Sequence, residues 1–206
     1  MNTKKRDEEY VAHTYGRYDL ELVKGKGSLL YDEKGNEYID MATGIAVNTF
    51  GACDEEWLGA VTSQLKTLCH TSNLYYTEPC TSLAELLSEK TGCKKVFFSN
   101  SGAEANECAI KTARKYAADK KGKDYYNIIT LKNSFHGRTI TTLSATGQEA
   151  LHKDFLPLTE GFIYVEADAE ELKEAVLKNK VAAIMFECIQ GEGGVLPLTK
   201  QFVDEA

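Results

Sequence analysis

The sequence lacks several features that define whole classes of protein. Its 206 residues contain no run approaching the roughly 18 consecutive apolar residues of a membrane span, and no apolar stretch follows the charged N-terminus, as a cleaved signal peptide requires. Lysine plus arginine number 24 against 31 for aspartate plus glutamate, so the net charge of −7 provides no basic footprint for nucleic acid or an anionic membrane. We therefore expect a cytoplasmic protein that binds neither nucleic acid nor membrane.

Cysteine and proline are present only in uninformative arrangements. The six cysteines include no CxxC pair, which disfavours a metal site or a disulfide scaffold. We expect reduced thiols, most of them buried as small hydrophobic residues, and no bound metal. The three prolines do not cluster into a linker. Apolar residues make up 43% and charged residues 27%, which is ordinary globular usage and excludes a disordered chain.

The order of the expected elements indicates an α/β fold. Residues 20–40 predict a small antiparallel meander, because turn signals separate short strand-like runs. Two helices are expected next, followed by an alternation of strands and helices in which several strands are apolar on both faces, as in a buried parallel sheet. The predicted helices cover about 54–68, 77–92, 101–120, 138–145, 168–179 and 199–206, and the predicted strands cover 95–99, 126–131, 162–165 and 181–186.

The first candidate site lies where the strand 95–99 passes into a long helix. Ser101 is placed to cap that helix, and Glu104 follows in capping-box spacing. Gly102 lets a ligand approach the backbone closely, and the amides and dipole at the helix start favour a phosphate. A well-capped helix that binds nothing fits the same residues equally well.

A second candidate is the loop at 133–139. Arg138 offers a planar fork for a carboxylate, and Phe135 can cover the face of a flat ring. The alternative is an ordinary loop, with Phe135 in the core and Arg138 in a surface ion pair. A third stretch, 187–194, follows the strand 181–186. Because ligands collect at the carboxyl ends of parallel strands, one crevice is expected to receive all three motifs.

A fourth candidate is the polar and aromatic link at 70–76, which joins two predicted helices and contains Tyr75. It either lines a substrate pocket or packs as a simple loop, and the residues alone favour neither.

Together these stretches resemble the class III, pyridoxal-phosphate-dependent aminotransferases of fold type I, and most closely the acetylornithine aminotransferase group. The resemblance implies an incomplete large domain at residues 51–206, a mostly parallel sheet with flanking helices. A small antiparallel N-terminal segment, residues 1–50, would belong to the small domain. The similarity covers essentially the whole chain and rests on residues 15–18, 44–48, 72–76, 100–107, 133–139, 146–149 and 190–194.

The resemblance implies a role for each matching position toward the cofactor, pyridoxal 5′-phosphate. The backbone amides of Gly102 and Ala103, next to Ser101, would hold its phosphate. Phe135 would stack on its pyridine ring, and Glu187 would lie beside it.

Three further positions would meet the substrates. Arg138 would bind the α-carboxylate, and Glu192 looks like the family glutamate that pairs with a switching arginine so that one pocket accepts two substrates. Tyr75 would face the active site, in part across the interface of a homodimer.

The activity implied is transfer of an amino group from N-acetylornithine to 2-oxoglutarate in arginine biosynthesis. Ornithine, 4-aminobutyrate or succinyldiaminopimelate are alternative donors, and a non-catalytic truncated product is a further alternative. No catalytic residue is expected in this chain, because the family's Schiff-base lysine is expected beyond residue 206. The chain also departs from the family pattern at Cys53 and Cys188.

Overall fold

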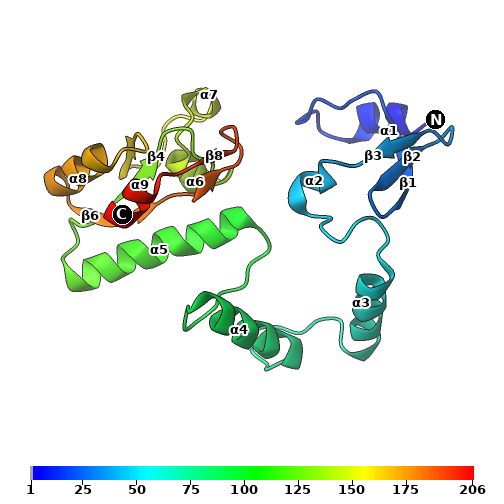
Figure 1. Ribbon diagram of the computed structural model, residues 1–206, viewed down its shortest axis with the longest axis horizontal. Coiled ribbons are helices and arrows are strands. Elements are labelled where there is room, and N and C mark those ends of the chain that lie inside the picture. The colour runs from blue at the N-terminus through cyan, green and yellow to red at the C-terminus, as the bar shows by residue number, and fades with distance from the viewer. Residues whose placement is uncertain (1) are drawn as a thin grey trace. The chain divides into compact units, whose positions relative to one another are not determined.

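The computed structural model describes residues 2–206 (Figure 1). The chain forms two compact units, residues 1–81 and 82–206. The division that the sequence predicts at residue 50 concerns the domains of a larger protein and stays a prediction. No helix within residues 2–206 has the length and apolar character needed to cross a bilayer.

The first unit contains the expected antiparallel meander. Its three strands pair in the order β1-β2-β3. The turn between the last two strands is fixed by buried Asp32, whose carboxylate accepts hydrogen bonds from the Lys34 and Asn36 amides and the Tyr38 hydroxyl. The side-chain amide of Asn36 also donates to this carboxylate, at 2.8 Å, and is the largest of the contributions that hold the pKa of Asp32 below its usual value. The unit comprises α1 (Thr3–Tyr10), β1 (Leu22–Lys26), β2 (Leu29–Asp32), β3 (Glu37–Ile39), α2 (Thr43–Ala46) and α3 (Glu55–Thr67).

The two helices expected after the meander are confirmed. Asp54 caps α3, since its side chain accepts a hydrogen bond from the amide of Trp57 at 2.8 Å. The next helix, α4 (Glu78–Thr91), contains the boundary between the two units. Neither helix has a buried residue, so the apolar faces that predicted them remain largely exposed.

The second unit is built on a three-stranded parallel sheet in the order β5-β4-β6. This arrangement confirms the α/β fold with a mostly parallel sheet. Its elements are α5 (Gly102–Lys120), β4 (Asn127–Leu131), α6 (Ile140–Ala145), α7 (Glu149–His152), β5 (Phe162–Val165), α8 (Ala169–Lys178), β6 (Val181–Met185), β7 (Ile189–Gln190), β8 (Leu196–Pro197) and α9 (Lys200–Glu205).

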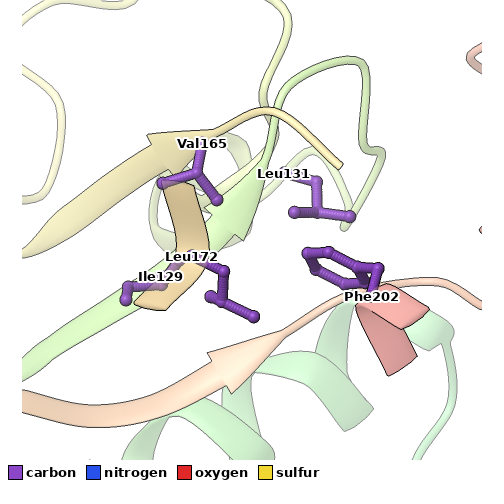
Figure 2. Packing of buried hydrophobic residues seen from close by; sticks show 5 residues of the cluster. All are labelled: Ile129, Leu131, Val165, Leu172 and Phe202. Carbon is purple, nitrogen blue, oxygen red and sulfur yellow. The ribbon is translucent and has the colours of Figure 1, made fainter. Parts of the chain in front are cut away.

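The central strand β4 supplies a hydrophobic core on each face of the sheet. Ile129 and Leu131 point to one face, where they pack with residues of β5, α8 and α9; Figure 2 shows these side chains converging on Phe202. Ile128 points to the other face and packs with Ile110 of α5 and Ala145 of α6. Alternation along one strand therefore produces a three-layer α/β/α unit.

Two expectations were wrong. Residues 95–99 form no strand and pair with no strand among residues 2–206. Their apolar side chains are therefore not buried by the sheet, and Phe97 is 63% exposed. The cysteines are free thiols as expected, but five are exposed and only Cys108 is partly covered. Most of them lie in the loops and in α4, where few residues are buried. Five short elements, α1, α2, α7, β7 and β8, were not expected.

Candidate functional site

The start of α5 has the capped geometry that the sequence predicts. Ser101 accepts a hydrogen bond from the Glu104 amide at 3.2 Å through its hydroxyl, and its carbonyl accepts from the Ala105 amide at 3.0 Å. The Glu104 carboxylate in turn accepts from the Asn100 amide at 2.6 Å. These bonds use the amides of Glu104 and Ala105, which leaves those of Gly102 and Ala103 without a helical acceptor.

The space around Gly102 is open. A β-carbon built on this residue would meet no atom within 4 Å apart from its chain neighbours and the backbone of its own helix, so neither packing nor backbone conformation requires glycine here. Two free amides, the positive end of a 19-residue helix and an unobstructed approach together form a site suited to an anion.

Hydrogen bonds connect the loop 133–139 to the first turns of α5. The Asn106 side chain donates to the carbonyl of His136 at 2.8 Å, and the Thr139 hydroxyl donates to the Glu107 carboxylate at 2.5 Å. A β-carbon on Gly137 would lie 2.9 Å from that of Ala103. The structure therefore brings the first two candidate motifs into direct contact.

Glu187 connects the same loop to the neighbouring strand. Its carboxylate accepts a hydrogen bond from the Phe135 amide at 3.0 Å. Phe135 follows β4 and Glu187 follows β6, and these strands are adjacent, whereas the chain leaving β4 goes on to β5 on the opposite side. The contact thus lies at a topological switch point, where open α/β sheets bind ligands.

Phe135 and Arg138 form a pair within this loop. The guanidinium carbon of Arg138 lies 5.6 Å from the centre of the half-buried Phe135 ring, at cation–π distance. Among residues 2–206 no carboxylate lies at salt-bridge distance from Arg138. The alternative interpretation, with Phe135 in the core and Arg138 in a surface ion pair, does not describe this geometry. An exposed guanidinium remains available to a carboxylate.

His136 is the buried polar residue of the loop, with 4% of its surface exposed. Its backbone is held on both sides, because its amide donates to the Thr146 hydroxyl at 2.9 Å and its carbonyl accepts from Asn106. The ring atom Nε2 has no hydrogen-bond partner. Burial lowers the pKa of His136, and the negative charge of Glu187 opposes this effect only in part. The imidazole is therefore neutral at pH 7.

Gln148 links the third motif, residues 187–194, to the loop 133–139. Composition and spacing did not single out this residue. One amide nitrogen, Nε2 of Gln148, donates to the Ser134 carbonyl at 3.1 Å and to the Glu192 carboxylate at 2.5 Å. Gln148 also lines a pocket of about 800 Å³ at the ends of β4 and β5, together with Lys132, Tyr164 and Glu166 among others. Of the sequence signals, only the similarity at 146–149 included this residue.

Tyr75 lies in the first unit, in a turn where its amide donates to the Ser72 carbonyl at 3.1 Å, and 69% of its surface is exposed. The other candidate residues all belong to the second unit, where the contacts above join them. The roles that the sequence assigns to all of these residues stay predictions.

Comparison with known proteins extends over nearly the whole chain. The model of the family described as aminotransferase class-III matches residues 10–206. Among curated proteins, the acetylornithine aminotransferase of Haemophilus ducreyi is 50% identical over 201 residues, which is 97% of this chain and 51% of that protein. The acetylornithine aminotransferase of Caldanaerobacter subterraneus is 52% identical over 198 residues, 96% of this chain and 50% of that protein.

A solved structure of ornithine aminotransferase from Toxoplasma gondii, described as having partial occupancy of PLP at the active site, superposes with a TM-score of 0.90. It is 32% identical, and the match covers 98% of this chain and 48% of that one. The chain thus spans about half the length of the proteins it matches.

Proposed function

Because the chain belongs to the class-III aminotransferase family, we propose that it is the part of an acetylornithine aminotransferase that binds the phosphate and ring of pyridoxal 5′-phosphate and the substrate α-carboxylate. The complete enzyme would move an amino group from N-acetylornithine to 2-oxoglutarate. The names of the curated relatives support this donor.

The residues present fit the cofactor. Gly102 and Ala103 offer two amides at a helix N-terminus, with open space in front of them, to the phosphate. The half-buried ring of Phe135 offers a flat face to the pyridine, and its position is set by the bond from its amide to Glu187. The cofactor, when bound, supplies the electron sink for the chemistry at Cα.

Arg138 would orient the amino-acid substrate. Its guanidinium is exposed and held over Phe135, so a carboxylate bound to it would place the substrate beside the ring. His136, the buried residue of this loop, is neutral, so it contributes no charge that would compete for the carboxylate.

The proposed enzyme is a homodimer in which Tyr75 faces the active site. The exposure of Tyr75 in an open turn supports its availability for such a contact. Sedimentation of the complete protein would test the dimer.

One observation carries the proposal: the start of α5, the loop 133–139 and Glu187 are joined by hydrogen bonds at the switch point of a parallel sheet. The test is to purify the complete protein that contains this chain and measure pyridoxal 5′-phosphate binding by absorbance. Amino transfer to 2-oxoglutarate is then measured from N-acetylornithine, ornithine, 4-aminobutyrate and succinyldiaminopimelate. We expect N-acetylornithine to have the highest kcat/KM. A higher value for another donor would refute the choice of substrate, and absence of cofactor binding would refute the activity.

A further inference from the structure

The pocket of about 800 Å³ that Gln148 lines is separate from the contact between Phe135 and Glu187. Its walls come from α7 and from the ends of β4 and β5, where Lys132 and Glu166 follow the two strands. Because β4 is the middle strand of the sheet, this pocket and the switch point between β4 and β6 lie on opposite sides of that strand. Small-molecule sites typically measure about 300–1,000 Å³, so the pocket has the volume of such a site.

His152 is a buried polar residue in the wall of this pocket, with 9% of its surface exposed. Its Nε2 atom lies 3.0 Å from the Leu143 carbonyl oxygen and 2.7 Å from the Thr146 carbonyl oxygen. A carbonyl oxygen only accepts, so Nε2 carries the hydrogen, and in the neutral ring Nδ1 keeps a free lone pair. Nδ1 has no hydrogen-bond partner among residues 2–206 and, unlike Nε2 of His136, it is not shut off from solvent. This buried side chain therefore offers the pocket an acceptor that nothing else uses.

Two more acceptors adjoin His152 in the sequence. Both hydrogens of the Gln148 amide nitrogen are engaged, one by the Ser134 carbonyl and one by the Glu192 carboxylate. These bonds orient the amide, whose carbonyl oxygen Oε1 has no hydrogen-bond partner in the described part of the chain. Glu149, the next residue, is exposed and takes part in no salt bridge within residues 2–206. The segment 148–152 thus presents three acceptors to one pocket.

The charge of the pocket favours a cation. Among the described residues that line it, Lys132 is the one lysine or arginine, and its ammonium lies 2.7 Å from the Glu166 carboxylate. The hydrogen bond to Glu166 raises the pKa of Lys132, and the charges of Glu166, Glu171 and Glu149 act in the same direction. Since Lys132 and Glu166 neutralise each other, the Glu149 carboxylate is left as an uncompensated negative charge.

We propose that this pocket binds an alkylguanidinium cation, a role that does not depend on the proposed amino transfer. A guanidinium carries its N–H donors in a rigid planar fork, so it can meet the Glu149 carboxylate, Gln148 Oε1 and His152 Nδ1 together. The ring of Tyr164 also lines the pocket, with its centre 6.0 Å from that of the His152 ring, and gives the cation an aromatic surface to lie against. An ammonium is more strongly hydrated and has fewer donors, so it should bind more weakly.

The test is a calorimetric titration of the complete protein that contains this chain, in the presence of pyridoxal 5′-phosphate and at constant ionic strength. The probe is methylguanidinium chloride, at concentrations far below those that unfold proteins, and methylammonium chloride is the comparison. We expect saturable binding of one methylguanidinium per chain, with a Kd about tenfold lower than that of methylammonium.

Glu149→Gln removes the uncompensated charge and keeps the shape of an exposed side chain. It should raise the Kd for methylguanidinium about tenfold, because a hydrogen bond to a charged group is lost. Glu170→Gln is the matched control, since it removes the same charge from the first turn of α8, outside the pocket. The Kd of this control should stay within about twofold of wild type, because an exposed charge outside the pocket is largely screened by salt.

His152→Gln removes the Nδ1 acceptor while its amide nitrogen can still donate to the two carbonyls. It should weaken methylguanidinium binding by about fivefold or more. If this variant has a lower melting temperature than wild type, the result with Glu149→Gln decides alone.

Absence of saturable methylguanidinium binding, or an unchanged Kd in Glu149→Gln, would overturn the proposal. Tighter binding of sulfate than of methylguanidinium, lost in Lys132→Met, would assign the pocket to an anion and overturn it as well. Failure of the complete protein to transfer an amino group would refute the proposed function but would not alter this binding measurement, so the two failures are distinguishable.

Discussion

Replacing Gly102 by alanine separates what the fold needs from what a ligand needs. Apart from its chain neighbours and the backbone of its own helix, no atom lies within 4 Å of the added β-carbon. Because the residue is also the first of α5, the fold accommodates alanine without strain. Because alanine lowers the conformational entropy of the unfolded chain, the substitution should then stabilise the protein by about 0.4–1 kcal/mol. The same methyl group would stand where a phosphate must approach the Gly102 and Ala103 amides. Crowding of this kind costs about 1–3 kcal/mol, which corresponds to a loss of cofactor affinity of roughly 5- to 150-fold.

The assay measures two quantities on the complete protein: the free energy of urea unfolding without cofactor, and the Kd for pyridoxal 5′-phosphate by fluorescence titration. Gly147→Ala is the matched control, because its β-carbon would lie 2.1 Å from the Leu131 carbonyl oxygen and should destabilise the fold by at least about 1–3 kcal/mol. An unchanged cofactor Kd in a Gly102→Ala protein that is folded and equally or more stable would refute the phosphate assignment.

Three further predictions test other parts of the structure. Arg138→Ala should raise KM for both the amino donor and 2-oxoglutarate, by roughly tenfold or more, since both carry an α-carboxylate; steady-state kinetics with unchanged KM for both would remove Arg138 from the site. Because burial holds the pKa of His136 below its ordinary 6.5, the unfolded chain binds a proton first, so stability is lost as pH falls below about 6.5. His136→Asn should flatten that dependence in urea unfolding between pH 7.5 and 5.5, and an equally steep dependence in this variant would contradict the reasoning. Phe202→Ala should cost about 3–5 kcal/mol by urea denaturation, against a small loss for the more exposed Val203→Ala; a loss under 1 kcal/mol would contradict the core of Figure 2.

Much of the second unit could be predicted from local signals. The apolar run of β4 indicated a strand buried on both faces, and the caps Ser101 and Asp168 marked the first turns of α5 and α8. These features depend on residues that are near each other in the sequence, which explains why periodicity and spacing detect them.

Some features that depend on distant partners could not be predicted. Residues 95–99 have the composition of a strand, but a strand forms only when a neighbour pairs with it, and none does so within residues 2–206. The bond from Gln148 to Glu192 joins residues 44 positions apart, and no local sequence pattern around a glutamine predicts such a long-range contact. The exposure of the cysteines likewise depends on how completely the helices are covered, which composition does not determine.

The unpaired segment 95–99 has a thermodynamic consequence for the anion site that it precedes. It leads directly into Ser101, so any strand that paired with it would order the approach to Gly102 before a ligand arrived. If the segment is already ordered, phosphate binding no longer has to offset the entropy cost of ordering it, so the affinity for a phosphate would rise. Linkage is reciprocal: a phosphate held at α5 would favour that pairing by the same factor. Completion of the sheet and retention of the cofactor would therefore be one cooperative event.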